Sequence, residues 1–138
     1  MCIRDSIDAL LSKAAAAGTR ARVVDMSADF RYRSVQAFES NYRQAHAAPG
    51  RIGEFTCALP EHLATLATEH VAHPGCFATA TLLAAVPLLA LKLASARLFV
   101  AGVTGSTGSG RKCVEGTHHP LRHSDFYAYN ALAHRRLL

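Results

Sequence analysis

The chain has 138 residues, half of them hydrophobic and 18% charged, which is typical of a globular chain that can bury a core. Its net charge is +5, but the bases are scattered singly among acids, which argues against a nucleic-acid-binding stripe and suits a site for anionic small molecules. The longest apolar segment, residues 77–91, contains Pro87 and two threonines, so it is too short and too interrupted to span a bilayer.

The four cysteines lie far apart and form no Cys-x-x-Cys pair: Cys2, Cys57, Cys76 and Cys113. No secretory leader precedes them, so we expect free thiols and a cytoplasmic location. Residues 1–6 have no relation to the pattern that follows them, and we expect them to be a non-native leader.

The first predicted elements are a helix over residues 7–17, where apolar residues recur at helical spacing, and a short β-branched strand over residues 22–26. A helix followed by a buried strand is typical of a βαβ unit and a parallel sheet. Ligands of such sheets bind beyond the carboxyl ends of the strands. We therefore expect Ser27, Asp29 and Arg31 to lie near any site.

The segment that follows, residues 30–53, reads as irregular, although its middle is compatible with a helix over residues 34–48. Further along the chain, the pattern predicts a short helix opening at residues 58–62, a strand at 69–72, a long helix at 77–93 and a third clear strand at 98–103.

The stretch around Cys76 is the most informative. A short strand runs into a Pro-Gly turn, and Cys76 then falls at or just before the start of an Ala/Leu-rich helix. Unpaired N–H groups and the helix dipole stabilise an anion at such a position, which favours a reactive thiolate. A cysteine at such a junction can also be a small buried apolar residue. Cys76 is nevertheless the best candidate nucleophile in the chain.

A Gly/Ser-rich loop follows the predicted strand at 98–103 and leads into Arg111-Lys112. Its glycines let a ligand approach the backbone, and its hydroxyl and amide groups can donate hydrogen bonds to phosphate. Most such loops are simply flexible turns, and this one is neither a P-loop nor a GxGxxG turn. Its residues are Gly105, Ser106, Thr107, Gly108, Ser109 and Gly110.

Histidines near the end of the chain suggest two chemistries. Cys113, His118, His119 and His123 could be drawn as a zinc site, but paired ligands are missing and Pro120 breaks the run, so loop or substrate-side histidines are favoured over a metal. A catalytic cysteine also needs a base, and His134 titrates in the right range, although a lone histidine is more often a surface residue.

Taken together, these motifs resemble N-acetyl-γ-glutamyl-phosphate reductase of arginine biosynthesis, in the same order along the chain. The resemblance covers nearly everything from residue 7 onward. It rests on residues 25–31, 59–61, 73–80, 105–111 and 117–120, and on Tyr129 with His134 and Arg135.

The resemblance implies an α/β fold: a partial Rossmann-type parallel sheet followed by the start of a semialdehyde-dehydrogenase-type α+β catalytic domain. Residues 7–75 would be the later half of the dinucleotide-binding domain, and residues 76–138 the truncated beginning of the catalytic domain.

The chemistry implied is NADPH-dependent reduction of an acyl phosphate to a semialdehyde, with NADP as cofactor. Cys76 would attack the acyl phosphate, phosphate would leave, and hydride from the nicotinamide would reduce the thioacyl-enzyme. His134 matches the family's acid/base histidine, and residues 105–110 match the segment that lines the cofactor. The expected substrate-side residues are Ser27, Arg31, Arg111, His118 and His119.

The chain also departs from the family pattern. A Gly-rich dinucleotide turn is missing ahead of Ile7, a Tyr-Gly pair is replaced at Cys57-Ala58, and Arg136 stands where a second histidine is usual. We therefore expect an internal fragment that is itself inactive. The resemblance also implies that the parent enzyme is a homo-oligomer.

Two alternatives remain open at this stage. One is a reductase of the same family that acts on an aminoadipyl or N-succinylglutamyl phosphate. The other is a non-catalytic metal- or ligand-binding module built from the Cys113 and histidine cluster described above.

Overall fold

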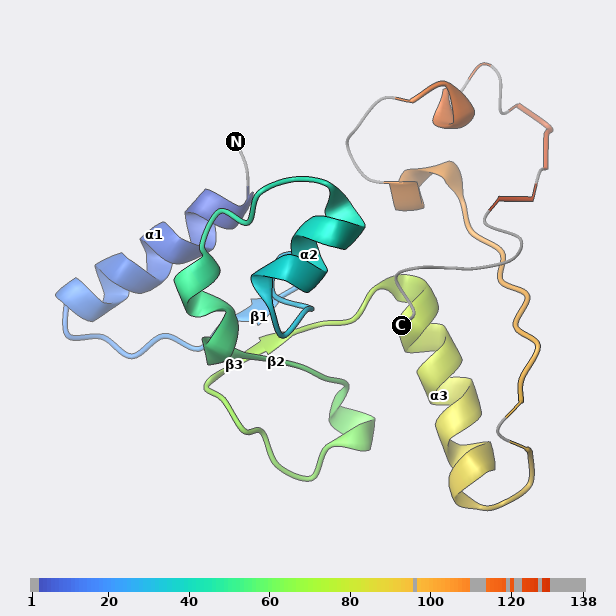
Figure 1. Ribbon diagram of the computed structural model, residues 1–138, viewed down its shortest axis with the longest axis horizontal. Coiled ribbons are helices and arrows are strands. Elements are labelled where there is room, and N and C mark those ends of the chain that lie inside the picture. The colour runs from blue at the N-terminus through green and yellow to red at the C-terminus, as the bar shows by residue number, and fades with distance from the viewer. Residues whose placement is uncertain are drawn as a thin grey trace.

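The centre of the fold is a three-stranded parallel sheet with the strand order β1-β3-β2 (Figure 1). The computed structural model describes residues 3–95, 97–109, 114–118, 120, 123–126 and 128–129. The strands are β1 (Val24–Asp25), β2 (Phe55–Cys57) and β3 (His70–Ala72), and the helices are α1 (Ile3–Ala16), α2 (Val35–Tyr42) and α3 (Cys76–Ala90). Four short 3-10 helices complete the described elements: η1 (Pro49–Glu54), η2 (Pro60–His62), η3 (Ser106–Ser109) and η4 (Glu115–Thr117).

The central strand β3 fixes the register of both neighbours. Val71 pairs with Val24 of β1 and with Thr56 of β2. Because all three strands are parallel, their carboxyl ends lie at one edge of the sheet, where the segments after Asp25 and Ala72 begin. The α/β class predicted from the sequence is confirmed at this level.

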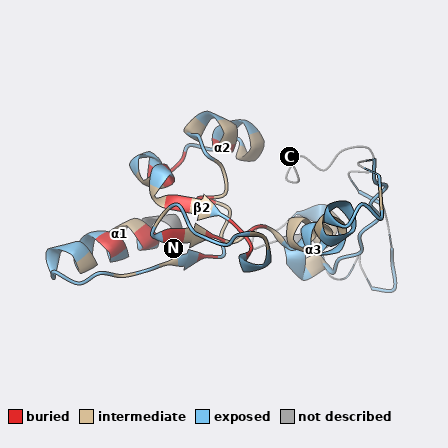
Figure 2. Ribbon diagram, turned by 90° about the horizontal axis from the view of Figure 1, so that it is seen from below, coloured by how far each residue is buried: buried red, intermediate tan, exposed pale blue. Residues whose placement is uncertain are grey.

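One face of the sheet carries the hydrophobic core. Ile7 and Leu11 of α1 pack with Ile52 of η1 and with the strand residues Phe55 and Ala72. Figure 2 shows these buried positions as red bands on α1 and on the strands. Ile7 and Leu11 from the spacing that predicted the first helix therefore pack in the core, whereas Leu10 of the same spacing is 54% exposed.

Phe30 joins the core to the segment after β1. It is 1% exposed and stacks on Phe55, with ring centroids 4.0 Å apart and an interplanar angle of 9°. His46 contacts the edge of Phe30 and accepts a hydrogen bond at Nδ1 from the Ala48 N–H (3.1 Å), so Nε2 carries the proton and donates to the Asp29 carbonyl (2.8 Å). These contacts fix the segment that contains Asp29.

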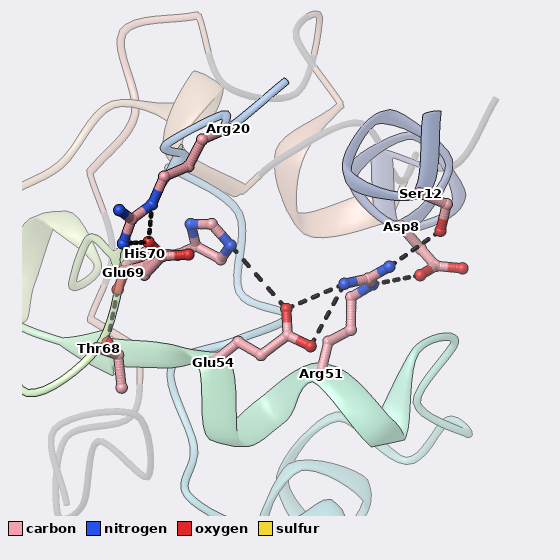
Figure 3. A network of polar contacts seen from close by, with 8 residues as sticks. All are labelled: Asp8, Ser12, Arg20, Arg51, Glu54, Thr68, Glu69 and His70. Carbon is pink, nitrogen blue, oxygen red and sulfur yellow. Dashed lines mark hydrogen bonds and ion pairs between the residues drawn. The ribbon is translucent and has the colours of Figure 1, made fainter. Parts of the chain in front are cut away.

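At the opposite end of the strands, a polar network ties α1 to η1 (Figure 3). Arg51 bonds Asp8 and donates to Ser12 Oγ (2.9 Å) and to Glu54 Oε2 (3.0 Å). The hydrogen bonds that the Arg51 guanidinium donates to Asp8 and Glu54 raise its pKa above the usual value. This network lies at the amino-terminal end of β3, where His70 is found, and so away from Cys76.

The helix α3 begins at Cys76 and contains Pro87, which cannot donate an N–H to the preceding turn. It is apolar along its whole length, yet none of its residues is buried, and Figure 2 shows it in tan and pale blue. A helix that is hydrophobic all round is normally buried, so α3 presents apolar surface in this chain.

Several element predictions were wrong in extent. The first helix begins at Ile3, within residues 1–6 that were set apart as a leader, and the helix compatible with residues 34–48 ends at Tyr42, where Arg43 adopts a left-handed conformation (φ 52°). The predicted helix at 58–62 is a single 3-10 turn, η2.

The predicted strand at 98–103 is not a strand in the structure. Phe99 is 96% exposed and Val103 is 79% exposed, and no described residue pairs with this segment. A strand needs a partner, and the three strands described form a separate sheet among themselves. Among the described residues, no helix is both long and apolar enough to cross a membrane.

We predict that Phe30→Ala destabilises the chain by about 3–5 kcal/mol, because it empties a buried aromatic site that packs on Phe55. Phe99→Ala is the matched control, since its ring is exposed. Urea unfolding monitored by circular dichroism measures both. Equal midpoints for the two variants would contradict the core position assigned to Phe30.

Candidate functional site around Cys76

Two segments meet at the carboxyl edge of the sheet: the one that follows β1 and the one that joins β3 to α3. The His73 N–H donates to the carbonyl of Asp25, the last residue of β1 (2.7 Å), which continues the pairing of the two strands one residue beyond the end of β3. Three residues later Cys76 opens α3. The nucleophile candidate therefore lies where parallel α/β sheets bind their ligands.

Cys76 is a free thiol, exposed to solvent, at the first position of α3. Gly75 is the N-cap and offers no side-chain acceptor, while its carbonyl accepts the Thr79 N–H (2.8 Å). The first N–H groups of an α-helix lack intrahelical partners and carry the positive end of its dipole. An anion formed at Cys76, on the thiol or on a bound acyl group, meets these donors.

The Arg31 side chain reaches from the segment after β1 to the Cys76 turn. Its Nε donates to the His73 carbonyl (2.9 Å) and its Nη2 donates to the Met26 carbonyl (3.0 Å). Its Nη1 lies 3.2 Å from the point where a Cβ on Gly75 would stand. The structure thus brings Arg31, one of the predicted substrate-side residues, to the residue before Cys76.

Ser27 is engaged within its own loop. Its hydroxyl lies 2.9 Å from Asp25 Oδ2 and 3.1 Å from Asp29 Oδ2, and it accepts the Asp29 N–H (3.2 Å). Both carboxylates are buried, with Asp25 2% and Asp29 5% exposed. The hydrogen bonds among Asp25, Ser27 and Asp29 therefore shape the segment from which Arg31 projects.

An apolar cavity of about 670 Å³ lies beside the Cys76 turn. It is bounded by Val24 of β1, the 58–66 segment, His73, and Thr79 and Leu83 of α3. The His73 Nδ1 lies 2.8 Å from the Pro74 carbonyl, so Nδ1 carries the proton and the opposite ring nitrogen is the basic one. Cys76 itself does not line this cavity.

Cys57, at the carboxyl end of β2, is the other described thiol near this edge. Partial burial raises the pKa of the Cys57 thiol, and the charges of Arg31 and Arg33 oppose the rise. Cys57 therefore contains less thiolate at neutral pH than an ordinary exposed cysteine.

The segment after α3 returns to the Cys76 turn. A Cβ on Gly102 would stand 2.3 Å from Phe77 Cε1, so only glycine fits against that ring. The Phe77 ring also lies 6.5 Å, centroid to centroid, from the Tyr129 ring. Parts of the chain that are far apart in sequence thus converge on the residue after Cys76.

The predicted cofactor loop is described as far as Ser109. It forms η3, in which the Gly108 N–H donates to the Gly105 carbonyl (3.1 Å). The loop begins within about 10 Å of Gly102, because three residues of fully extended chain span no more than that. Nearby η4 contacts η3 and is followed by the exposed His118.

Several predicted site residues lie outside the described part of the chain: Gly110, Arg111, His119 and His134. Cys113, from the alternative metal cluster, is also outside it. Within the described ranges, no group of three or more His, Cys, Asp or Glu residues is arranged to hold a metal ion.

Three residues shape the site although the sequence pattern predicted no role for them: Gly75, His73 and Thr79. The Thr79 Oγ1 lies 3.4 Å from the Pro74 carbonyl and its side chain lines the cavity. The available signal was the position of Thr79 one helical turn after Cys76, where two side chains share a face. No local pattern could reveal that Gly75 must leave space for Arg31, 44 positions earlier in the chain.

Comparison with known proteins places this site in a family. Residues 76–137 match the model of the semialdehyde dehydrogenase dimerisation domain, a match that begins at Cys76. The chain is 40% identical over 117 residues to an N-acetyl-γ-glutamyl-phosphate reductase of Methanopyrus kandleri, which covers 83% of the chain and 34% of that protein.

Two further relatives show the breadth of the similarity. A [LysW]-L-2-aminoadipate 6-phosphate reductase of Deinococcus radiodurans is 37% identical over 116 residues, covering 82% of the chain and 33% of the relative. An N-acetyl-γ-glutamyl-phosphate reductase of Nitrosococcus oceani is 36% identical over 136 residues, covering 96% of the chain and 38% of the relative. The family resemblance drawn from the motifs is confirmed: residues 76–137 match the semialdehyde dehydrogenase dimerisation domain, and the chain is similar to N-acetyl-γ-glutamyl-phosphate reductases, of whose length it spans about a third.

Proposed function

We propose that this chain is the nucleophile-bearing part of a reductase that converts N-acetyl-γ-glutamyl phosphate to N-acetylglutamate semialdehyde and releases phosphate. The observation that carries the proposal is the position of Cys76, an exposed free thiol at the first residue of α3, beyond the carboxyl ends of three parallel strands. The similarity to proteins of this name supports the choice of substrate class.

In the proposed reaction the Cys76 thiolate attacks the acyl carbon. A C–S bond forms, the bond from that carbon to the phosphate oxygen breaks, and inorganic phosphate leaves with the electron pair. Donors at the start of α3 stabilise the oxyanion of the tetrahedral intermediate. Reduction of the resulting thioester by two electrons and one proton, delivered together as hydride, gives the aldehyde and returns the Cys76 thiolate.

The reduction needs a hydride donor, which we propose to be NADPH, with NADP as the family's cofactor; a nicotinamide supplies that hydride when it is bound. The described residues fit the reactive end of such a cofactor, because residues 105–108 are mostly exposed and follow Gly102, which lies against Phe77, next to Cys76. Within the described ranges, no Gly-rich turn joins the end of a strand to the start of a helix. We therefore propose that the pyrophosphate of NADPH is bound outside these ranges.

His134 is the proposed acid/base. Its support is that Tyr129, five residues earlier, lies against Phe77, so the chain returns to the Cys76 turn shortly before His134. In this role His134 would hold the proton that the thiol gives up and return it to the oxygen of the thiohemiacetal.

Substrate-side roles are proposed for Arg31, whose guanidinium lies beside Gly75, and for Arg111, His118 and His119 on the segment after the glycine loop. Ser27 belongs to the same proposal, but its hydroxyl is engaged with Asp25 and Asp29, so its contribution would be to shape the loop that carries Arg31.

A second candidate is reduction of a 2-aminoadipate phosphate carried on LysW, because proteins named for that reaction reach similar identity over the same share of this chain. The two reactions share the chemistry at Cys76 and differ in the acyl tail. Steady-state assays of the complete protein with each acyl phosphate separate them by kcat/KM. An N-succinylated substrate serves as the third comparison.

The remaining parts of the proposal concern the whole protein. We propose that residues 7–75 belong to its dinucleotide-binding domain and that residues 76–138 begin its catalytic domain. The match of residues 76–137 to a dimerisation domain supports a homo-oligomeric parent. A cytoplasmic location fits the free thiols Cys57 and Cys76.

We predict that Cys76→Ser in the complete protein lowers kcat by on the order of 10⁴-fold or more, because the hydroxyl is not ionised at neutral pH. Cys57→Ser is the matched control and keeps near-normal turnover. Phosphate release coupled to NADPH oxidation is the assay. Turnover within tenfold of wild type in Cys76→Ser would remove this thiol from the mechanism.

We also predict that iodoacetamide labels Cys76 faster than Cys57 or Cys113 near pH 7. The raised pKa of Cys57 leaves it largely protonated there, so its labelling accelerates only as the pH rises into the alkaline range. Mass spectrometry of peptides at timed intervals assigns the rates, and a Cys57→Ser chain checks the assignment. Equal rates for Cys57 and Cys76 at neutral pH would contradict an activated thiol at α3.

A further inference from the structure

The Cys76 turn is held from both sides at a single residue, His73. The His73 N–H donates to the Asp25 carbonyl of β1, and the His73 carbonyl accepts from Arg31 Nε. Two residues later Gly75 caps the helix that Cys76 opens. Any displacement of His73 is therefore passed along three bonded residues to the thiol.

Arg31 performs this task with two nitrogens at once. Its Nε reaches His73 and its Nη2 reaches the carbonyl of Met26, which belongs to the segment after β1. The planar guanidinium thus cross-links the segments that follow two neighbouring strands. A lysine carries the same charge on a single nitrogen and cannot reproduce the pair of directed donors.

Gly75 completes the arrangement. Its φ of −67° is open to any residue, so a glycine is not demanded by backbone conformation. A Cβ there would approach Arg31 Nη1 to 3.2 Å, closer than an ordinary contact, so the guanidinium would have to shift by a few tenths of an ångström. Because Gly75 has no side chain, the Arg31 guanidinium can lie beside it.

We propose that Arg31 is a positioning residue that sets the location of the Cys76 thiol through its two hydrogen bonds to backbone carbonyls. This role rests on the proposed function, in which Cys76 is the nucleophile. It is the alternative to the substrate-side role named above for Arg31, in which the guanidinium binds the substrate phosphate by charge. The two roles predict different responses to a lysine at this position.

The first test measures kcat and KM for the acyl phosphate in the complete protein carrying Arg31→Lys, Arg31→Gln or Arg33→Gln. Positioning predicts that both Arg31 variants lose kcat by roughly 100-fold, the cost of a misplaced reacting group, while KM changes less than about threefold. Arg33 is exposed and serves as the matched control, with both constants near wild type. If Arg31→Lys keeps most of kcat and raises KM, Arg31 binds the substrate by charge and the proposal is overturned.

The second test is a double-mutant cycle with Gly75→Ala. In the Arg31 protein the added methyl group displaces the guanidinium, and we expect kcat to fall about tenfold or more. In the Arg31→Lys background the same methyl group meets no guanidinium and costs little further activity. Additive losses would show that Gly75 and Arg31 act independently and would overturn the proposed coupling.

A third measurement does not depend on activity. Amide hydrogen exchange in the 138-residue chain reports the His73 and Thr79 N–H groups, which donate to Asp25 and Gly75. Arg31→Gln is expected to speed both exchange rates at least tenfold, and Arg33→Gln to leave them unchanged. Unchanged rates in Arg31→Gln overturn the proposal. If the complete protein reduces no acyl phosphate but these rates change, the proposed function fails and the structural role of Arg31 stands.

Discussion

The pairing of β3 with both neighbouring strands is the constraint on which the rest of the structure depends. β3 has only three residues, yet its register with β1 and β2 brings the segments that follow β1 and β3 together at one edge of the sheet. The Asp25–Ser27–Asp29 group, the Arg31 side chain and the Cys76 turn all lie on those segments. A slip of one residue would exchange the faces of every strand residue and carry Ala72 out of the core.

The pairing is kept in place by side chains rather than by strand length. Phe30 and Phe55 stack under the sheet, and His46 fixes the Asp29 carbonyl through a ring whose other nitrogen accepts from Ala48. At the far end, Arg51 links α1 to η1 through Asp8, Ser12 and Glu54. Short strands with few ladder bonds thus gain their order from a core on one face and a polar network at one end.

The sequence was informative wherever a local signal was strong. Gly75 after a proline, followed by an apolar run, located the start of α3 to within a residue, and the helical spacing of Ile7 and Leu11 located the buried face of α1. It was uninformative where structure depends on a distant partner. β2 has three residues, too few for an alternating pattern to stand out, and it exists because β3 pairs with it.

The same reasoning explains the wrong strand at 98–103. The segment has the composition of a buried strand, with Leu98, Phe99, Val100 and Val103. Such a composition suits a strand that pairs with a neighbour, and the described residues provide no such neighbour. For the site, the motif around Cys76 was visible locally. The fit between Arg31 and Gly75 was not, because it depends on the packing of two segments that lie 44 positions apart.

The exposure of α3 bears on how the nucleophile is held. An apolar helix with no buried residue cannot fix its own position through packing, and Pro87 weakens it further toward its end. Cys76 is therefore held by contacts around the amino-terminal turn of α3. The N–H and the carbonyl of His73 are both hydrogen-bonded, and the Phe77 ring lies against Gly102. These contacts are made by residues within three positions of the thiol, so the remainder of the helix can adapt to whatever packs against it without moving Cys76. Because these contacts lie at the start of the helix, the position of the Cys76 thiol does not depend on how the apolar surface of α3 is packed.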